Sequence, residues 1–156
     1  MRLPLGFQKS ALVARQLLLA ATAVVAIPAW AIDYLSVGEA AILYDGPSLK
    51  AKPVFAIARG TPVEQVVALG GWIKVRDAKG DLAWMEKSQL SPQRTVIVRS
   101  KAAQIRAEAT DGAALVFEAE AEVVLELVGP GAAGWVQVRH AGGQSGFVKV
   151  AQVWGS

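Results

Sequence analysis

The chain has few residues of the types that carry out catalysis. His140 is its only histidine and cysteine is absent, which excludes thiol catalysis and thiolate metal sites. A serine nucleophile would need His140 as its base, and Ser145 is the nearest serine in sequence. Residues 143–146 read Gly-Gln-Ser-Gly, which lacks the G-x-S-x-G spacing of a nucleophile elbow and is typical of a hairpin turn. We therefore expect no catalytic residue, no metal site, no cofactor and no enzymatic activity.

Three acidic residues, Glu118, Glu120 and Glu122, recur at a spacing of two. In a strand this spacing places all three side chains on one face. Paired carboxylates carry out glycoside hydrolysis only when they face each other across a cleft, which neighbours along one strand do not. The sequence favours a solvated strand face, and a surface for a basic partner is the alternative.

Basic residues are concentrated at the N-terminus. The first 31 residues hold three of the 16 Lys and Arg and none of the 13 Asp and Glu, which leaves 13 residues of each sign from Ile32 onward. No cluster of Lys and Arg remains in that part of the chain, and such a cluster is what a phosphate backbone requires. We therefore expect no nucleic-acid partner.

The N-terminal 31 residues have the pattern of a signal peptide. A basic segment precedes 11 apolar residues from Leu17 to Ile27, and Ala29-Trp30-Ala31 follows as an A-x-A cleavage pattern. The apolar run is shorter than the roughly 20 residues of a membrane span, although an uncleaved anchor is the alternative. Ile32 is not cysteine, so no lipid attachment is expected there. The sequence predicts cleavage after Ala31, a periplasmic or secreted protein, and no stable membrane insertion after cleavage.

The rest of the chain repeats itself. Gly71-Trp72 recurs 63 residues later as Gly134-Trp135, and residues 40–44 resemble residues 102–106. A fixed period of this kind indicates two copies of one structural unit. Short apolar runs of period two, separated by Gly, Pro and Asp, predict strands rather than helices in each copy. The expected strands lie near 40–44, 54–58, 62–69, 72–77 and 81–86, then near 94–98, 103–106, 115–119, 121–128, 135–140 and 145–150.

Each copy places a tryptophan on the polar face of a strand. In residues 72–76, Ile73 and Val75 share one face, which leaves Trp72 on the other face with Lys74 and Arg76. Residues 135–139 divide in the same way. An indole on a polar face either packs against a neighbouring loop or forms a half-exposed platform for a ligand, and the sequence leaves both alternatives open.

These motifs together resemble the bacterial Src-homology-3-like (SH3b) domain. Ala41–Asp45 is similar to the ALYDY motif of the family, and residues 71–75 and 134–138 are similar to its G-W-x-x-V strand. Residues 83–85 and 146–148 are similar to its closing G-W-V strand. The resemblance implies an all-β chain of two tandem small five-stranded barrels behind the signal peptide. The expected divisions are residues 1–31 for the signal peptide, 32–92 for the first barrel and 93–156 for the second.

The resemblance also implies a binding role at an aromatic groove. The candidate ligand-binding residues are Tyr44, Trp72, Trp84, Trp135 and Phe147. In eukaryotic members the groove binds proline-rich helices and includes a P-x-x-Y turn, but here that turn reads Glu-Lys-Ser-Gln at 86–89. We therefore expect the partner to be a cell-envelope protein, a peptide or peptidoglycan. The alternative is a structural spacer or assembly subunit in which the tryptophans, Trp154 among them, seal the joint between the barrels.

Cleavage after Ala31 is directly testable. N-terminal sequencing of the protein recovered from the exported fraction is expected to begin at Ile32. A protein that still begins at Met1 would contradict cleavage and would support the uncleaved anchor.

Overall fold

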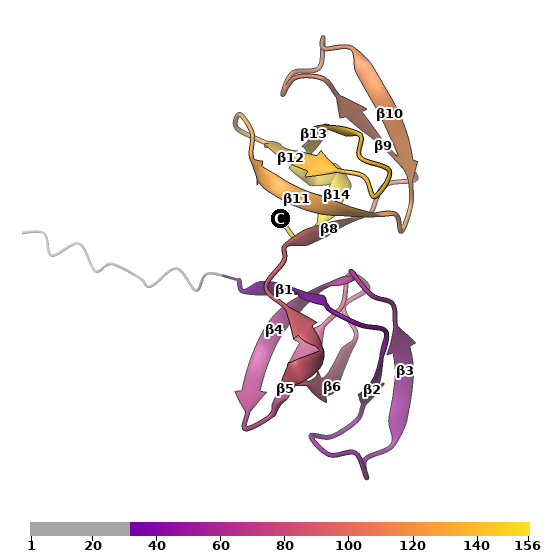
Figure 1. Ribbon diagram of the computed structural model, residues 1–156, viewed down its shortest axis with the longest axis vertical. Coiled ribbons are helices and arrows are strands. Elements are labelled where there is room, and N and C mark those ends of the chain that lie inside the picture. Colours follow the sequence, from indigo (N-terminus) through magenta and orange to yellow (C-terminus); the bar gives the residue numbers. More distant parts are fainter. Residues whose placement is uncertain (1–31) are drawn as a thin grey trace, which may run out of the picture. The chain divides into compact units, whose positions relative to one another are not determined.

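The computed structural model describes residues 32–156, and the expected signal peptide lies outside the described residues. The described part is all-β and contains two sheets of seven strands each (Figure 1). The expected fold of two tandem SH3-like barrels is confirmed. No helix within residues 32–156 is long and apolar enough to cross a membrane.

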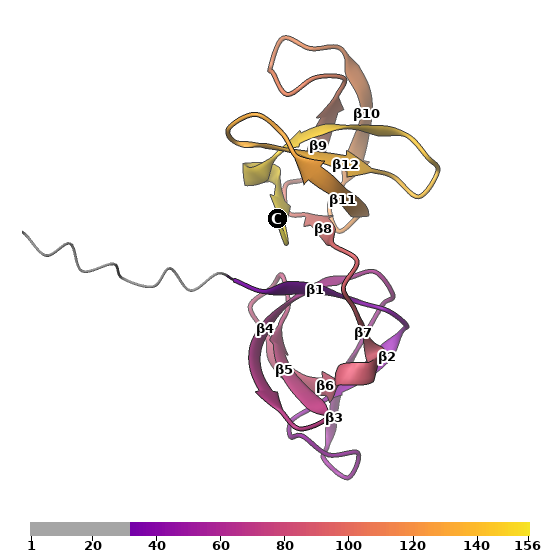
Figure 2. The ribbon, with the colours of Figure 1, turned by 60° about the vertical axis from the view of Figure 1, so that its left-hand side comes forward.

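The first sheet curls around its own core (Figure 2). Its strand order is β3-β2-β6-β5-β4-β1-β7, and all its pairings are antiparallel. Strands β2 to β6 coincide with the five expected strands, whereas two short strands, β1 and β7, were not predicted. The elements are β1 (Tyr34–Val37), β2 (Ala41–Tyr44), β3 (Pro53–Ile57), β4 (Pro62–Leu69), β5 (Trp72–Arg76), β6 (Leu82–Glu86), η1 (Lys87–Gln89) and β7 (Leu90–Ser91).

The second sheet repeats the first element by element. Its order, β10-β9-β13-β12-β11-β8-β14, matches that of the first sheet strand for strand. The expected strand near 94–98 is β8, which pairs with β11 and β14 of its own sheet. The elements are β8 (Thr95–Val98), β9 (Ala102–Arg106), β10 (Leu115–Glu120), β11 (Val124–Pro130), β12 (Trp135–Arg139), β13 (Ser145–Lys149), η2 (Val150–Gln152) and β14 (Val153–Trp154).

The alternation of side chains along the strands builds the two cores. In β5 the buried side chains are Ile73 and Val75, as the pattern predicts, and Trp72, Lys74 and Arg76 are half-buried on the other face. Each barrel has a core of nine buried residues. These are Val37, Ala41, Leu43, Ile57, Val63, Ile73, Val75, Ala83 and Met85 in the first barrel, and Val96, Val98, Ala103, Ile105, Ala119, Leu125, Val138, Val148 and Val153 in the second.

The expected stripe of three glutamates is only partly formed. Glu118 and Glu120 are exposed on β10, in agreement with the spacing of two. Glu122 lies beyond the end of β10, in a turn where its φ is +69°. The prediction that all three share one strand face was therefore wrong, because β10 ends at Glu120 and the chain turns before Val124.

Two barrels of this size support each other through a joint with buried polar groups. The Ser36 hydroxyl donates to the Gln93 carbonyl at 2.6 Å, and the Thr95 hydroxyl donates to the Gly60 carbonyl at 2.7 Å. Both hydroxyls belong to buried residues, so their hydrogen bonds are costly to lose. These bonds fix the first barrel to the start of β8.

An aromatic contact completes the joint. The Tyr34 ring meets the Trp154 ring edge-on at 5.0 Å between centroids, and the Arg94 guanidinium lies 5.5 Å from the Tyr34 centroid. Arg94 also donates to the Gly155 carbonyl at 2.7 Å. Burial, and then the nearby Glu64 carboxylate, raise the pKa of the Tyr34 hydroxyl. Trp154 is thus the tryptophan that contacts the joint.

The two cores differ at one matched pair of positions. Ala83 of the first barrel corresponds to Gly146 of the second, and Leu43 corresponds to Ile105. A Cβ placed on Gly146 would lie 2.5 Å from Ile105 Cγ2 and 2.6 Å from the Arg106 carbonyl oxygen. The β-branch of isoleucine therefore occupies space that leucine leaves for an alanine methyl group.

We predict that Gly146→Ala destabilises the protein by about 1–3 kcal/mol, because the added methyl group overpacks the second core. The measurement is urea unfolding followed by circular dichroism. Gly112→Ala is the matched control, since its Cβ would meet nothing within 4 Å, and its effect should stay within about 0.5 kcal/mol. Equal stability of Gly146→Ala and the wild type would contradict this packing analysis.

Candidate functional site

Three of the five predicted ligand-binding residues gather on the outer face of the first barrel. Tyr44 on β2 lies directly across from Trp84 on β6, and Trp84 lies across from Lys74 on β5. The Tyr44 and Trp72 rings approach edge-on, with centroids 5.8 Å apart and planes at 84°. All three aromatic side chains are half-buried, which leaves part of each ring available. We call Tyr44, Trp72 and Trp84 the aromatic face.

Strand alternation explains why these rings are outside the core. Ala41 and Leu43 of β2 and Ala83 and Met85 of β6 point inward and are buried. The residues between them must therefore point outward. The outward-facing set includes the three aromatic residues, and it leaves a flat apolar platform where three neighbouring strands meet.

Apolar and charged residues border the aromatic face. Ile42 precedes Tyr44 on the same side of β2 and is 48% exposed, and Leu69 pairs with Trp72 across a two-residue hairpin. Lys74 lies beside Trp84, and Glu86 lies directly across from Trp72. Neither Lys74 nor Glu86 forms an ion pair within residues 32–156. The face therefore offers aromatic rings together with one cation and one anion.

The sequence analysis did not assign Lys74 and Glu86 to the site. The signal for Lys74 was present, because it alternates with the buried residues Ile73 and Val75 exactly as Trp72 does. Glu86 could be found only from the pairing of β5 with β6, since its position beside Trp72 depends on the register between the strands.

The other two predicted residues, Trp135 and Phe147, occupy the equivalent face of the second barrel. Trp135 lies across from Lys149, and Phe147 lies between Gln137 and Arg106 on neighbouring strands. Arg106 thus takes the place of Tyr44, and Lys149 takes the place of Glu86. These two residues do not join the aromatic face of the first barrel.

The chain's own side chains cover part of this second face. The Lys149 ammonium lies 5.6 Å from the Trp135 ring centroid and forms an ion pair with Asp111. Arg106 donates to the Ala113 carbonyl at 2.7 Å and to the Gln104 side chain at 2.6 Å. A ligand would have to compete with these contacts, so this face is less available than that of the first barrel.

His140 has a structural environment. Its Nδ1 accepts a hydrogen bond from the Gly142 backbone N–H at 3.1 Å, and its ring meets Phe117 edge-on at 5.8 Å. Asp77 occupies the same position in the first barrel and likewise accepts backbone N–H groups of its turn. Within residues 32–156, no cluster of His, Cys, Asp and Glu has the arrangement of a metal site.

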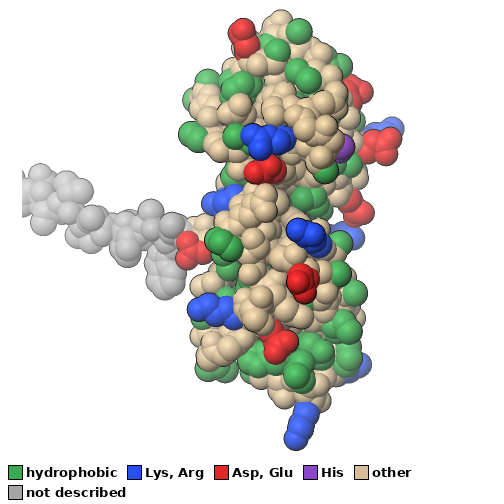
Figure 3. Space-filling model, viewed as in Figure 1, with side chains coloured by type: hydrophobic (Ala, Val, Ile, Leu, Met, Phe, Trp, Pro, Cys, Tyr) green, Lys and Arg blue, Asp and Glu red, His purple; other side chains and the backbone are tan. Residues whose placement is uncertain are grey.

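Charges of both signs are interspersed over the surface. Figure 3 shows Lys and Arg side chains next to Asp and Glu on both barrels, with no large area of one sign on the face in view. Four ion pairs join described residues: Arg76 with Glu64, Lys79 with Glu122, Arg139 with Glu126, and Lys149 with Asp111. The sequence-based expectation of balanced charge therefore extends to this face.

Comparisons with solved structures show only distant similarity. One match is an NlpC/P60 family protein from Bacillus cereus, with 15% identity over 78% of this chain and 55% of the other, at a TM-score of 0.37. Another is NlpC2 from Trichomonas vaginalis, with 14% identity over 77% of this chain and 46% of the other, at a TM-score of 0.35. The chain thus spans about half the length of these proteins. A search of curated proteins finds no match.

The family model described as "Bacterial SH3 domain" matches the chain twice. The matched residues are 37–92 and 99–155, which together make up more than half of the sequence and contain the core strands of each sheet. The two matches agree with the repeated sheet order and with the repeated aromatic strand positions. The chain belongs to the bacterial SH3 domain family and contains two tandem copies of the domain.

Proposed function

We propose that this protein is an exported, non-enzymatic binding module of the cell envelope whose main ligand site is the aromatic face of the first barrel. The observation that carries the proposal is the gathering of Tyr44, Trp72 and Trp84 on one outer face. Membership of the bacterial SH3 family supports a binding role. The export pattern of residues 1–31 supports action in the periplasm or outside the cell.

The chemistry of the face favours a peptide ligand. Half-exposed aromatic rings bind apolar groups and carbonyl-bearing chains with little loss of side-chain entropy. Lys74 and Glu86 add a cation and an anion on opposite sides of the tryptophans, and both are without an ion-pair partner among residues 32–156. A chain that carries an amino and a carboxyl group matches this arrangement. The peptide part of peptidoglycan is such a chain, and we propose it as the ligand.

The joint between the barrels favours a second role as a rigid spacer. Tyr34, Arg94 and Trp154 contact one another there, and two buried hydroxyls bridge the barrels. This observation supports a fixed relation between the two domains. It does not involve Tyr44, Trp72 or Trp84, so the spacer role and ligand binding at the aromatic face are compatible.

We predict that Trp72→Ala weakens binding to purified sacculi and to soluble muropeptides by at least about tenfold, because truncation of a central aromatic contact typically costs more than 1–2 kcal/mol. The measurements are a sacculus pull-down and a titration with muropeptides. Circular dichroism verifies that the variant is folded.

Two variants sharpen this test. Val128→Ala removes an exposed apolar side chain of the second barrel and is expected to bind as the wild type does. Trp135→Ala removes the equivalent indole of the second barrel and is expected to cost less than about threefold, since Lys149 already lies over that ring. Wild-type binding by a folded Trp72→Ala variant, or an equal loss in Trp135→Ala, would contradict a main site on the first barrel.

A further inference from the structure

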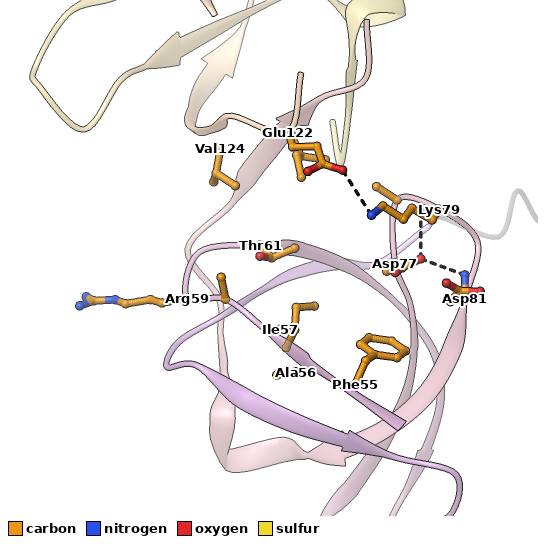
Figure 4. A pocket seen from close by; sticks show the side chains of 13 residues that line it. Phe55, Ala56, Ile57, Arg59, Thr61, Asp77, Lys79, Asp81, Glu122 and Val124 are labelled. Atoms are coloured by element: carbon orange, nitrogen blue, oxygen red, sulfur yellow. Dashed lines mark hydrogen bonds and ion pairs between the residues drawn. The ribbon is translucent and has the colours of Figure 1, made fainter. Parts of the chain in front are cut away.

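A hollow of about 530 Å³ lies beside β3 and is bordered by residues of both barrels (Figure 4). We call it the inter-barrel hollow. Phe55 and Ile57 of β3 form an apolar floor, and Ile97 and Val124 of the second barrel add further apolar surface. It is separate from the aromatic face, because Tyr44, Trp72 and Trp84 are not among its lining residues. The inter-barrel hollow is large enough for a long side chain.

Carboxylates outnumber cations at the rim of the inter-barrel hollow. Asp77, Asp81 and Glu122 line it together with Lys79, and Arg59 extends away from it (Figure 4). Asp77 already accepts the backbone N–H groups of Lys79 and Asp81 at 2.9 and 2.8 Å. Asp81 has no ion-pair partner within residues 32–156. A positively charged group above the apolar floor would therefore complement the charge of the rim.

Lys79 is the cation that now occupies this position. Its ammonium lies 3.3 Å from Glu122, and the two side chains are 73% and 71% exposed. Ion pairs with this exposure contribute little to stability and exchange readily with other charges. A basic group from outside could therefore displace Lys79 and take over its contact with Glu122.

The backbone at Glu122 is consistent with a role other than stability. Within residues 32–156 it is the only residue other than glycine with a positive φ, at +69°. The equivalent residue of the first barrel is Gly60, whose φ is +82°. Glycine adopts this conformation without steric cost, whereas other residues do so at a cost of about 1–2 kcal/mol. The second barrel thus has a carboxylate where glycine would fold more easily.

The second barrel has a smaller hollow at the equivalent place. It measures about 350 Å³ and is lined by Phe117, which corresponds to Phe55, and by His140, which corresponds to Asp77. Its carboxylates are Glu118 and Glu120. An aromatic floor with an acidic rim therefore occurs twice, although different sequence positions supply the acids.

We propose that the inter-barrel hollow binds a basic side chain of a peptide partner. The aliphatic part of that side chain packs on Phe55 and Val124, and its cation lies between Asp81 and Glu122 after displacing Lys79. A lysine or arginine side chain has this combination of an apolar stem and a charged end. The partner is thus a protein or peptide with an exposed basic residue.

The test uses the purified protein and three blocked tripeptides, acetyl-Ala-X-Ala-amide, in which X is lysine, norleucine or glutamate. Backbone amide chemical shifts are followed by NMR during each titration. The lysine peptide is expected to produce saturable shifts at Ala58, Lys79 and Glu122, and the norleucine and glutamate peptides are expected to bind at least about fivefold more weakly. Equal or tighter binding of the glutamate peptide would overturn the proposal.

Two substitutions distinguish ligand binding from a structural role. Glu122→Gly is expected to weaken binding of the lysine peptide about fivefold while the melting temperature is unchanged or higher, because glycine suits the positive φ. Lys79→Ala is expected to tighten binding by a few-fold, because it removes the competing ammonium. Glu39→Gln, which removes an exposed carboxylate outside the inter-barrel hollow, is the matched control and should bind as the wild type does.

The contradicting results are equally specific. Weaker binding by Lys79→Ala, or unchanged binding by Glu122→Gly, would overturn the proposal. Shifts at the residues of the inter-barrel hollow that depend on protein concentration and not on peptide would assign it to a second copy of the chain, which would also overturn it. A failure of peptidoglycan binding at Trp72 would not affect any of these outcomes, because the two surfaces share no lining residue.

Discussion

The strict alternation of inward and outward side chains is the constraint on which this structure depends. Each barrel has about sixty residues and a core of nine, so almost every inward position must be apolar. The two copies meet this requirement with similar residues: Val37 and Val98, Leu43 and Ile105, and Met85 and Val148 occupy equivalent places. Outward positions carry no such requirement, and this is where the copies differ.

The differences between the outer faces account for a division of roles. Tyr44 of the first barrel is replaced by Arg106 in the second, and Glu86 is replaced by Lys149. The first face keeps aromatic rings beside charges without ion-pair partners among residues 32–156, whereas the second face binds its own Lys149 over Trp135. Duplication thus retained the fold and left one face open to a ligand, while the joint and the inter-barrel hollow arose from the contact between the copies.

The sequence predicted the repeated strands well because each has alternation within itself. It did not predict β1 and β7, which have only four and two residues and depend on pairing with distant strands. It placed Trp72, Trp84 and Tyr44 on the outer face, but not Glu86 beside Trp72, since strand register decides that contact. The position of Glu122 was mispredicted because a non-glycine residue occupies a left-handed turn there. Contacts across the joint leave no periodic signal in the sequence.

The most direct test of the central claim is the response of the indole N–H resonances to soluble muropeptides. The chain has five tryptophans, and single substitutions by phenylalanine assign their signals. Binding at the aromatic face predicts saturable shifts for Trp72 and Trp84, with little change for Trp135 and for Trp154 at the joint. Shifts confined to Trp135 or Trp154, or no shift at Trp72 and Trp84 under saturating ligand, would contradict the account.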